Sequence, residues 1–242
     1  MNLSSELQHY VDAWKNEDDY NVQFHSELTE KVNRDPMLKR HRDWVEQNQF
    51  GFGDRAFGWV WKMLVDQMPQ EFSFLEIGVF KAQTLSLVAL LAKNSGKKAS
   101  VYGITTLENT RDVRCQYPAG DYRGWISQIH QHFEVTHPVL FVGRSNNPTV
   151  VQQSNGFAPY DLCYVDAGHD SEDVKHDILQ YAPMTKVGGF LAMDDASNLL
   201  NIGSCWPGLE QVSEAVRDHL ENDDRFKHLF ACGHLRIFQR IK

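Results

Sequence analysis

The 242-residue sequence has no long apolar run and no basic, apolar leader. Its longest apolar stretch, Leu85 to Ala92, is far shorter than the roughly 20 residues that a membrane-spanning helix needs. The first residues, MNLSSELQHYVDAWKNEDD, are polar and acidic, whereas a secretion signal needs a basic start and an apolar centre. We therefore expect a soluble, cytoplasmic protein that does not contact membranes.

The sequence also lacks an excess of positive charge and has few cysteines. Its formal net charge is -8 at pH 7, which argues against a surface built to neutralise nucleic-acid phosphates. No two cysteines form a C-x-x-C pair, and their wide spacing favours reduced thiols that serve in packing over a disulfide framework. These residues are Cys115, Cys163, Cys205 and Cys232.

No repeat, low-complexity tract or proline-rich linker divides the chain, so we expect a single domain with additions. Residues 1–68 are rich in charge and aromatic side chains, and they predict a helical cap or lid within that domain. The stretch QNQFGFGDRAFGW is the candidate lid, because Gly51 and Gly53 permit movement; a firmly packed helical cap is the alternative. Residues 69–242 form the α/β part.

From Phe72 onward, short apolar runs alternate with amphipathic stretches, a pattern typical of a parallel sheet covered by helices. The fold class is therefore α/β, with a doubly wound, mostly parallel Rossmann-like sheet. Strands are expected in FSFLEIG, SVYGIT, VLFVG, DLCYVD and GGFLAMDD, and helices over residues 83–93, 122–133, 172–181 and 209–222. The tail FKHLFACGHLRIFQRI predicts an antiparallel hairpin that turns at Cys232 and Gly233.

Three aspartates follow two neighbouring strands of this expected sheet. Asp166 closes the strand in YVDAGHD, and Asp194 and Asp195 close the strand in AMDD one crossover later. A right-handed crossover brings both strand ends to the same edge of the sheet. Like charges gathered there are unfavourable unless a cation compensates them, and oxygen ligands select Mg²⁺, Ca²⁺ or Mn²⁺. We predict a metal site; the alternative is a turn cap beside a solvated Asp166.

His169 stands three residues after Asp166, in the loop that precedes a predicted helix. Its ordinary pKa near 6.5 allows the imidazole to accept a proton at neutral pH or to act as a further ligand. Asp170 or Ser171 can cap that helix. The remaining histidines lack acidic neighbours of this kind, and His130, His132 and His137 are interpreted as structural.

Two earlier strands also end in polar residues. Glu76 and Gly78 end the first, and a helix whose N-terminus offers free amide donors follows; an ordinary strand-to-helix turn is the alternative. Thr105 and Thr106 end the second, where a nucleotide site often places an acid that binds ribose. A threonine hydroxyl can also bind ribose, although it can equally end a strand.

Together these residues resemble the class I S-adenosylmethionine-dependent methyltransferases, and within them the metal-dependent O-methyltransferases of the macrocin and mycinamicin sugar type. The resemblance runs from about Phe72 to the C-terminus. FLEIGVFKAQTL is similar to the family's cofactor motif, and YVDAGHD followed by GGFLAMDD is similar to the metal and base motif of that subgroup, which is the more specific of the two.

The resemblance implies a role for each residue. Asp166, Asp194 and Asp195 would hold Mg²⁺ or Mn²⁺, and His169 would be the general base. The cofactor-binding residues would be Glu76, Gly78 and Thr84 near the methionine part, Thr105 or Thr106 near the ribose, Ser145 near the adenine, and Asp166. The chain departs from the family pattern at Ala82 and Gln83, where glycines are usual, and at Thr105, where an acid is usual.

The implied reaction is direct methyl transfer to a hydroxyl group of a small natural product, such as a sugar or polyketide. A nicotinamide-dependent oxidoreductase is disfavoured because the chain has no G-x-G-x-x-G. A metal-dependent hydroxylase or hydrolase on the same fold, and a non-catalytic methyltransferase-like module, are the remaining alternatives. The sequence leaves the acceptor and the oligomeric state open, a homo-oligomer included.

Overall fold

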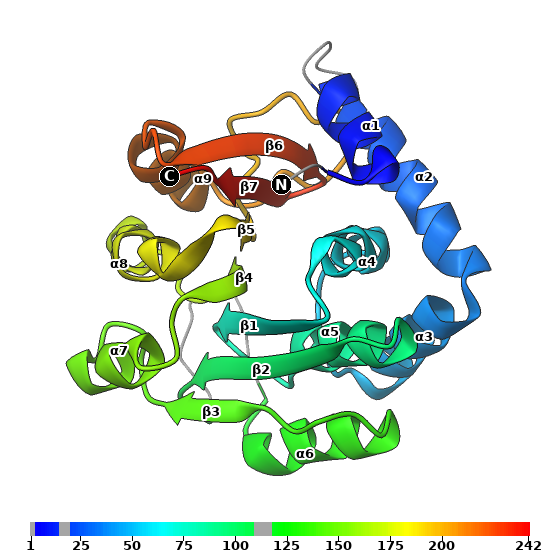
Figure 1. The fold of residues 1–242 in the computed structure, drawn as a ribbon, viewed down its shortest axis with the longest axis vertical. Helices are drawn as coiled ribbons and strands as arrows, with labels where there is room; N and C mark the ends of the chain where they lie inside the picture. Colours follow the sequence, from blue (N-terminus) through cyan, green and yellow to red (C-terminus); the bar gives the residue numbers. More distant parts are fainter. Residues whose placement is uncertain (1–2, 15–19, 109–117) are drawn as a thin grey trace.

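A computed structural model describes residues 3–14, 20–108 and 118–242, and Cys115 lies outside these ranges. A seven-stranded sheet forms the centre of the molecule, with helices on both faces (Figure 1). Its strands are β1 (Glu71–Ile77), β2 (Lys98–Thr105), β3 (Val139–Val142), β4 (Tyr160–Val165), β5 (Thr185–Met193), β6 (Phe226–Cys232) and β7 (Leu235–Arg240). The order across the sheet is β3-β2-β1-β4-β5-β7-β6.

The strands β1 to β5 pair in parallel, whereas β7 pairs antiparallel with both β5 and β6. The predicted α/β sheet with a C-terminal hairpin is thus confirmed. The hairpin turn lies one residue later than expected, because Cys232 still pairs with Leu235 and the positive φ of 55° falls on Gly233. Gly233 and His234 form the turn.

The helices are α1 (Ser5–Trp14), α2 (Tyr20–Arg34), α3 (Pro36–Asn48), α4 (Phe57–Gln67), α5 (Gln83–Asn94), α6 (Tyr122–His132), α7 (Pro148–Asn155), α8 (Ser171–Tyr181) and α9 (Glu210–Val216), which continues as a π-helical turn (Arg217–Glu221). The expected helices correspond to α5, α6, α8 and α9. Helix α7 was not predicted, although Asn147 caps it and Pro148 occupies its first turn.

An apolar core lies on each face of the sheet. On one face, the helices from α1 through α6 pack against strand side chains such as Phe74 and Leu162. On the other face, α7, α8 and α9 pack against Leu75 and Cys163. Because successive strand residues point to opposite faces, Glu76 and Tyr164 face the α4 and α5 side. Among the described residues, no helix is long and apolar enough to cross a membrane.

Candidate active site

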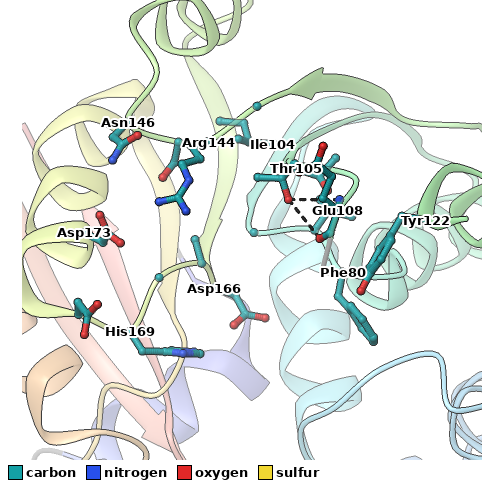
Figure 2. Close-up of a pocket in the computed structure, with 18 residues that line it drawn as sticks. Phe80, Ile104, Thr105, Glu108, Tyr122, Arg144, Asn146, Asp166, His169 and Asp173 are labelled. Atoms are coloured by element: carbon teal, nitrogen blue, oxygen red, sulfur yellow. Dashed lines mark hydrogen bonds between the residues drawn. The ribbon is translucent and has the colours of Figure 1, made fainter. Parts of the chain in front are cut away.

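A cavity of about 370 Å³ opens where the strand order reverses between β1 and β4. Ligands of open α/β sheets bind at this switch point, beyond the carboxyl ends of the strands. The segments that follow β1, β2, β3 and β4 all contribute to its lining. Figure 2 shows Asp166 and His169 near one end of the cavity, with Arg144 and Asn146 near the other. We call it the smaller cavity.

Gly78 permits the close approach of β1 and β4 beside this cavity. Its φ is +100°, and a Cβ atom there would lie 1.8 Å from the carbonyl oxygen of Asp166. No side chain fits in that space, so the position requires glycine. The predicted cofactor turn therefore has one glycine that the geometry demands.

Ala82, the N-cap of α5, has φ 64° and ψ 33°, a left-handed conformation. This conformation costs an ordinary residue about 1–2 kcal/mol and costs glycine little. Ala82 therefore replaces the glycine that is usual at this position but keeps a backbone conformation that glycine favours. Thr84 follows in the first turn of α5, buried in the wall of a second cavity.

Glu76 lies at the end of β1 with only 4% of its surface exposed, and its Oε2 has no hydrogen-bond partner among the described residues. Burial and then the charge of Asp166 raise the pKa of Glu76 well above its ordinary value, although a backbone hydrogen bond from Leu85 opposes the shift. A buried acceptor without a donor is costly, by about 1–3 kcal/mol. Glu76 is therefore ready to accept a hydrogen bond from a ligand.

The ends of β2 and β3 supply the opposite wall of the smaller cavity. Thr105 is 5% exposed and its Oγ1 accepts a hydrogen bond from the Leu107 amide at 3.1 Å. Thr106, Glu108 and Ser145 also line this wall. Glu108 was not singled out from the sequence, but it lines the cavity just after β2, the strand end where a ribose-binding acid is usual.

The last residue of helix α8 fixes the backbone at Ser145 through a hydrogen bond. Tyr181 donates a hydrogen bond from its hydroxyl to the Ser145 carbonyl at 2.7 Å. Both carboxyl oxygens of Asp177, on the same helix, are buried without a hydrogen-bond partner among the described residues. Burial raises the pKa of Asp177 to about 7. The N-cap of α8 is Asp170 as expected, but its side chain makes no capping hydrogen bond.

Asp166, Asp194 and Asp195 meet at the ends of β4 and β5. The Asp194 amide donates to the Val165 carbonyl at 3.0 Å, which places the second strand end beside the first. Burial, followed by the charge of Asp194, raises the pKa of Asp166 well above its ordinary value; burial and Asp195 do the same to Asp194. The Tyr164 hydroxyl donates to Asp166 Oδ2 at 3.2 Å.

His169 lies directly against this acidic cluster. Its Nε2 is 3.2 Å from Asp195 Oδ2, and the two side chains are 12% and 11% exposed. The structure thus brings together all four residues that the two strand ends predicted. By contrast, His130 is buried and its Nδ1 lies 2.8 Å from the Ile126 carbonyl, as a structural histidine would.

A second cavity of about 670 Å³, the larger cavity, lies between the sheet and the N-terminal helices. Its lining is mostly apolar and includes Phe57, Trp61 and Leu87. The two cavities share four lining residues, Gly78, Phe80, Asp166 and His169. A ligand in one cavity can therefore meet a ligand in the other at the carboxylate and histidine.

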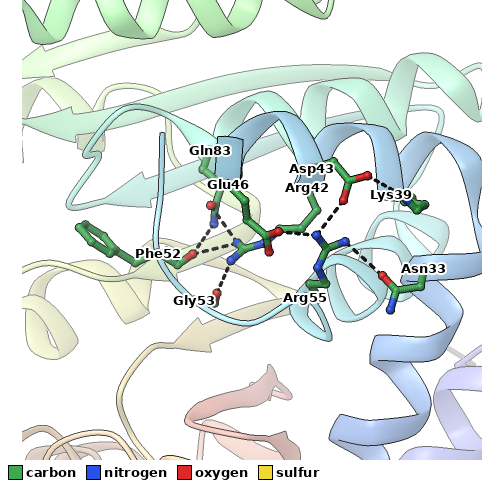
Figure 3. Close-up of polar contacts among 9 residues, drawn as sticks. All are labelled: Asn33, Lys39, Arg42, Asp43, Glu46, Phe52, Gly53, Arg55 and Gln83. Carbon is green, nitrogen blue, oxygen red and sulfur yellow. Dashed lines mark hydrogen bonds and ion pairs between the residues drawn. The ribbon is translucent and has the colours of Figure 1, made fainter. Parts of the chain in front are cut away.

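The candidate lid segment lines the larger cavity and is held by side-chain contacts (Figure 3). Arg42 donates to the Phe52 carbonyl at 3.1 Å and to the Gly53 carbonyl at 2.6 Å, and Gln83 donates to the same Phe52 carbonyl at 2.9 Å. Arg55 in turn pairs with Asp43 at 2.7 Å. In this conformation the segment is anchored to α3 and α5.

Several residues of the larger cavity were not singled out from the sequence, among them Asp54, Lys81, Trp206 and His234. Lys81 is 7% exposed; it donates to the Gln49 carbonyl at 2.8 Å and lies 4.4 Å from the centre of the Trp125 ring. His234 comes from the β6–β7 turn, far from the other site residues in sequence. No motif connects it to them, so only the folded chain reveals it.

Three side chains offer atoms suited to a metal ion: Asp194, Asp195 and His234 each provide one ligand atom, all within 4.8 Å of one another. Asp194 Oδ1 is buried without a hydrogen-bond partner among the described residues. A divalent cation relieves the repulsion between two buried carboxylates. It also gives the unpaired Asp194 oxygen a partner. The residues therefore fit a metal centre.

This sheet order, with ligand cavities at the switch point, defines a Rossmann-like fold with an antiparallel C-terminal hairpin. The sequence matches the methyltransferase domain family over residues 75–196, which spans every site residue from Glu76 to Asp195. The chain belongs to this methyltransferase family, which confirms the prediction that it is a methyltransferase. No curated protein sequence matches the chain.

Solved structures share the fold at low sequence identity. An O-methyltransferase from Bacillus cereus in complex with SAH has a TM-score of 0.58 and 14% identity, covering 96% of this chain and 100% of its own. CalS11, a TDP-rhamnose 3′-O-methyltransferase of calicheamicin biosynthesis, has a TM-score of 0.56 and 17% identity, covering 95% and 98%. The MycE methyltransferase of mycinamycin biosynthesis, in complex with Mg and SAH, has a TM-score of 0.53 and 15% identity, covering 86% and 55%.

Proposed function

We propose that the protein moves the methyl group of S-adenosylmethionine to a hydroxyl group of a small natural-product acceptor, a sugar or polyketide, in a reaction that depends on Mg²⁺ or Mn²⁺. The observation that carries the proposal is the pair of cavities that meet at Asp166 and His169. A direct transfer between two substrates needs two neighbouring sites with the reacting atoms in contact.

The smaller cavity is the proposed donor site. Ser145 would contact the adenine, and Thr105 and Thr106 the ribose. The methionine part would pass Gly78, which both cavities share, toward Glu76 and Thr84 in the wall of the larger cavity. The unpaired Oε2 of Glu76 supports this assignment, because the amino group of the donor supplies the missing hydrogen bond. S-adenosylmethionine supplies a methyl group already activated on a positively charged sulfur. Asp166 lies at the edge shared by the two cavities and would contact the donor there.

Asp166, Asp194 and Asp195 would hold the divalent cation at the edge of the larger cavity. The cation supplies Lewis acidity that lowers the pKa of an acceptor hydroxyl. Support comes from the raised pKa values of Asp166 and Asp194, which reflect carboxylates buried together. MycE, one of the structures with this fold, was solved with Mg.

His169 is the proposed general base, which removes the acceptor proton during methyl transfer. Asp195 Oδ2 lies 3.2 Å from His169 Nε2, and a carboxylate at this distance orients the imidazole. The carboxylate also stabilises the imidazolium ion that results. General bases of this kind contribute roughly 10²- to 10⁴-fold to rates.

The larger cavity is the proposed acceptor site. Its mostly apolar wall, with Phe57, Trp61 and Trp206, suits the hydrocarbon face of a sugar or polyketide. We propose further that residues 1–68 act as a cap over this site and residues 69–242 as the catalytic part. The contacts of Arg42 to the Phe52 and Gly53 carbonyls support this role, because they hold the candidate lid in the wall of the larger cavity.

Thermal melting tests the proposal, since a ligand that binds the native state raises the melting temperature. The protein is melted with S-adenosylmethionine, SAH or NAD, each with and without Mg²⁺. We expect stabilisation by the first two and not by NAD. Stabilisation by NAD alone, or by none of the three, overturns the proposal. Transfer of labelled methyl groups to a panel of hydroxylated sugars and polyketides then identifies the acceptor.

A further inference from the structure

His234 is the buried residue that the proposed reaction leaves unused. It follows Gly233 in the β6–β7 turn and is 4% exposed. Its carbonyl accepts a hydrogen bond from the Ala196 amide at 2.9 Å, which fixes the turn beside the end of β5. The backbone therefore holds this imidazole next to Asp194 and Asp195.

The ring nitrogen Nε2 faces both carboxylates without bonding to either. It lies 3.7 Å from Asp194 Oδ1 and 3.9 Å from Asp195 Oδ1, beyond hydrogen-bond distance. Bonds of about 2.1 Å around one metal ion place its ligand atoms about 3.0 to 4.2 Å apart. The distances from His234 Nε2 to the two carboxylate oxygens are therefore those expected of ligands of one metal ion and are too long for hydrogen bonds.

The second ring nitrogen faces a carboxylate that lies just beyond hydrogen-bond distance. Nδ1 makes no hydrogen bond among the described residues, and Asp54 Oδ2 lies 4.0 Å from it. Asp54 is itself held by His25, whose Nε2 is 2.9 Å from the same oxygen. A carboxylate behind the imidazole orients metal-binding histidines and strengthens their bond to the metal.

Two aromatic rings fix the imidazole in this orientation. Phe57 and Trp206 pack edge-to-face against His234, with ring centroids 4.7 and 4.8 Å away. A side chain confined in this way keeps Nε2 directed at the carboxylates. This packing makes the position rigid enough for ligation.

We propose that His234 Nε2 is a ligand of the cation held by Asp194 and Asp195, an inference that rests on the metal site of the proposed function. Oxygen ligands alone favour Mg²⁺, whereas imidazole nitrogen favours first-row transition ions. The site therefore selects Mn²⁺ or Co²⁺ over Mg²⁺.

Metal binding to the EDTA-treated full-length protein tests this proposal without any turnover. Calorimetric titration is expected to show Mn²⁺ and Co²⁺ binding about tenfold or more tightly than Mg²⁺. His234→Gln lowers the affinity for Mn²⁺ and Co²⁺ about tenfold or more and changes Mg²⁺ binding much less. The control, His219→Gln, on the π-helical turn outside both cavities, leaves all three affinities unchanged.

Electron spin echo spectroscopy of bound Mn²⁺ gives a direct readout, because a coordinated imidazole nitrogen modulates the echo. We expect this modulation in the wild-type protein and in His169→Gln, and its loss in His234→Gln. Wild-type protein without the nitrogen signal, or His234→Gln that retains it, overturns the inference. If Asp194→Asn leaves Mn²⁺ binding intact, the metal site of the proposed function fails as well; if it abolishes binding, that site stands independently of His234.

Discussion

His169 Nε2 lies 3.2 Å from Asp195 Oδ2, so the histidine after β4 is oriented by the acid after β5. Replacement of His169 by Asn keeps a polar side chain and removes the base. We expect kcat to fall about 10²- to 10⁴-fold while the Kd for S-adenosylmethionine changes little. Steady-state kinetics and calorimetry measure the two quantities. The control variant is His219→Asn, and full turnover by His169→Asn rules out the proposed base.

Gly78 and Gly96 form a matched pair that separates backbone strain from steric conflict. Both have positive φ, 100° and 70°, but a Cβ atom meets Asp166 at 1.8 Å in the first and open space in the second. Gly96→Ala is expected to lower the free energy of unfolding by about 1–2 kcal/mol. Gly78→Ala adds overpacking of about 1–3 kcal/mol and abolishes binding of S-adenosylmethionine. Urea unfolding tests the comparison, and equal losses of stability contradict it.

Asp177 makes the stability of the protein depend on pH. Burial raises its pKa from 3.8 to about 7, so the folded state binds a proton more tightly than the unfolded state. The stability of the wild-type protein therefore falls as pH rises from about 4 to about 7, and this contribution is constant above that range.

Asp177→Asn removes this titration and keeps a side chain of nearly the same size and shape. Relative to the wild type, the variant gains stability through the same pH range, by up to about 4 kcal/mol at 1.36 kcal/mol per pKa unit. Urea unfolding at pH 5 and pH 8 checks the sign. A stability difference that shrinks as pH rises contradicts the assignment.

Arg42 anchors the wall of the larger cavity. Its guanidinium holds the carbonyls of Phe52 and Gly53, so Arg42→Ala frees this segment and lowers the free energy of unfolding by about 1.5–3 kcal/mol. We expect KM for the acceptor to rise about tenfold and the Kd for S-adenosylmethionine to stay unchanged. Arg34→Ala removes an exposed pair with Glu30 and serves as the control, with little effect on either. Equal effects of the two variants exclude a role for the wall in acceptor binding.

The acidic cluster was predictable because strand periodicity and crossover handedness suffice to place Asp166 and Asp195 together. The same reasoning fails for His234, since the turn that carries it reaches the cluster only through the pairing of β7 with β5. Such a contact depends on the whole sheet and leaves no local spacing in the sequence. Helix α7 was missed although the cap Asn147 and Pro148 signalled its start, because its short polar sequence shows little apolar periodicity.

The central claim, that the smaller cavity holds the methyl donor against an acceptor site, is tested most directly by a crystal structure with SAH bound. We predict the adenine beside Ser145, the ribose beside Thr105, and the sulfur at the edge shared with the larger cavity, near Asp166. SAH with its adenosine part in the larger cavity, or anywhere outside the smaller one, would contradict the account.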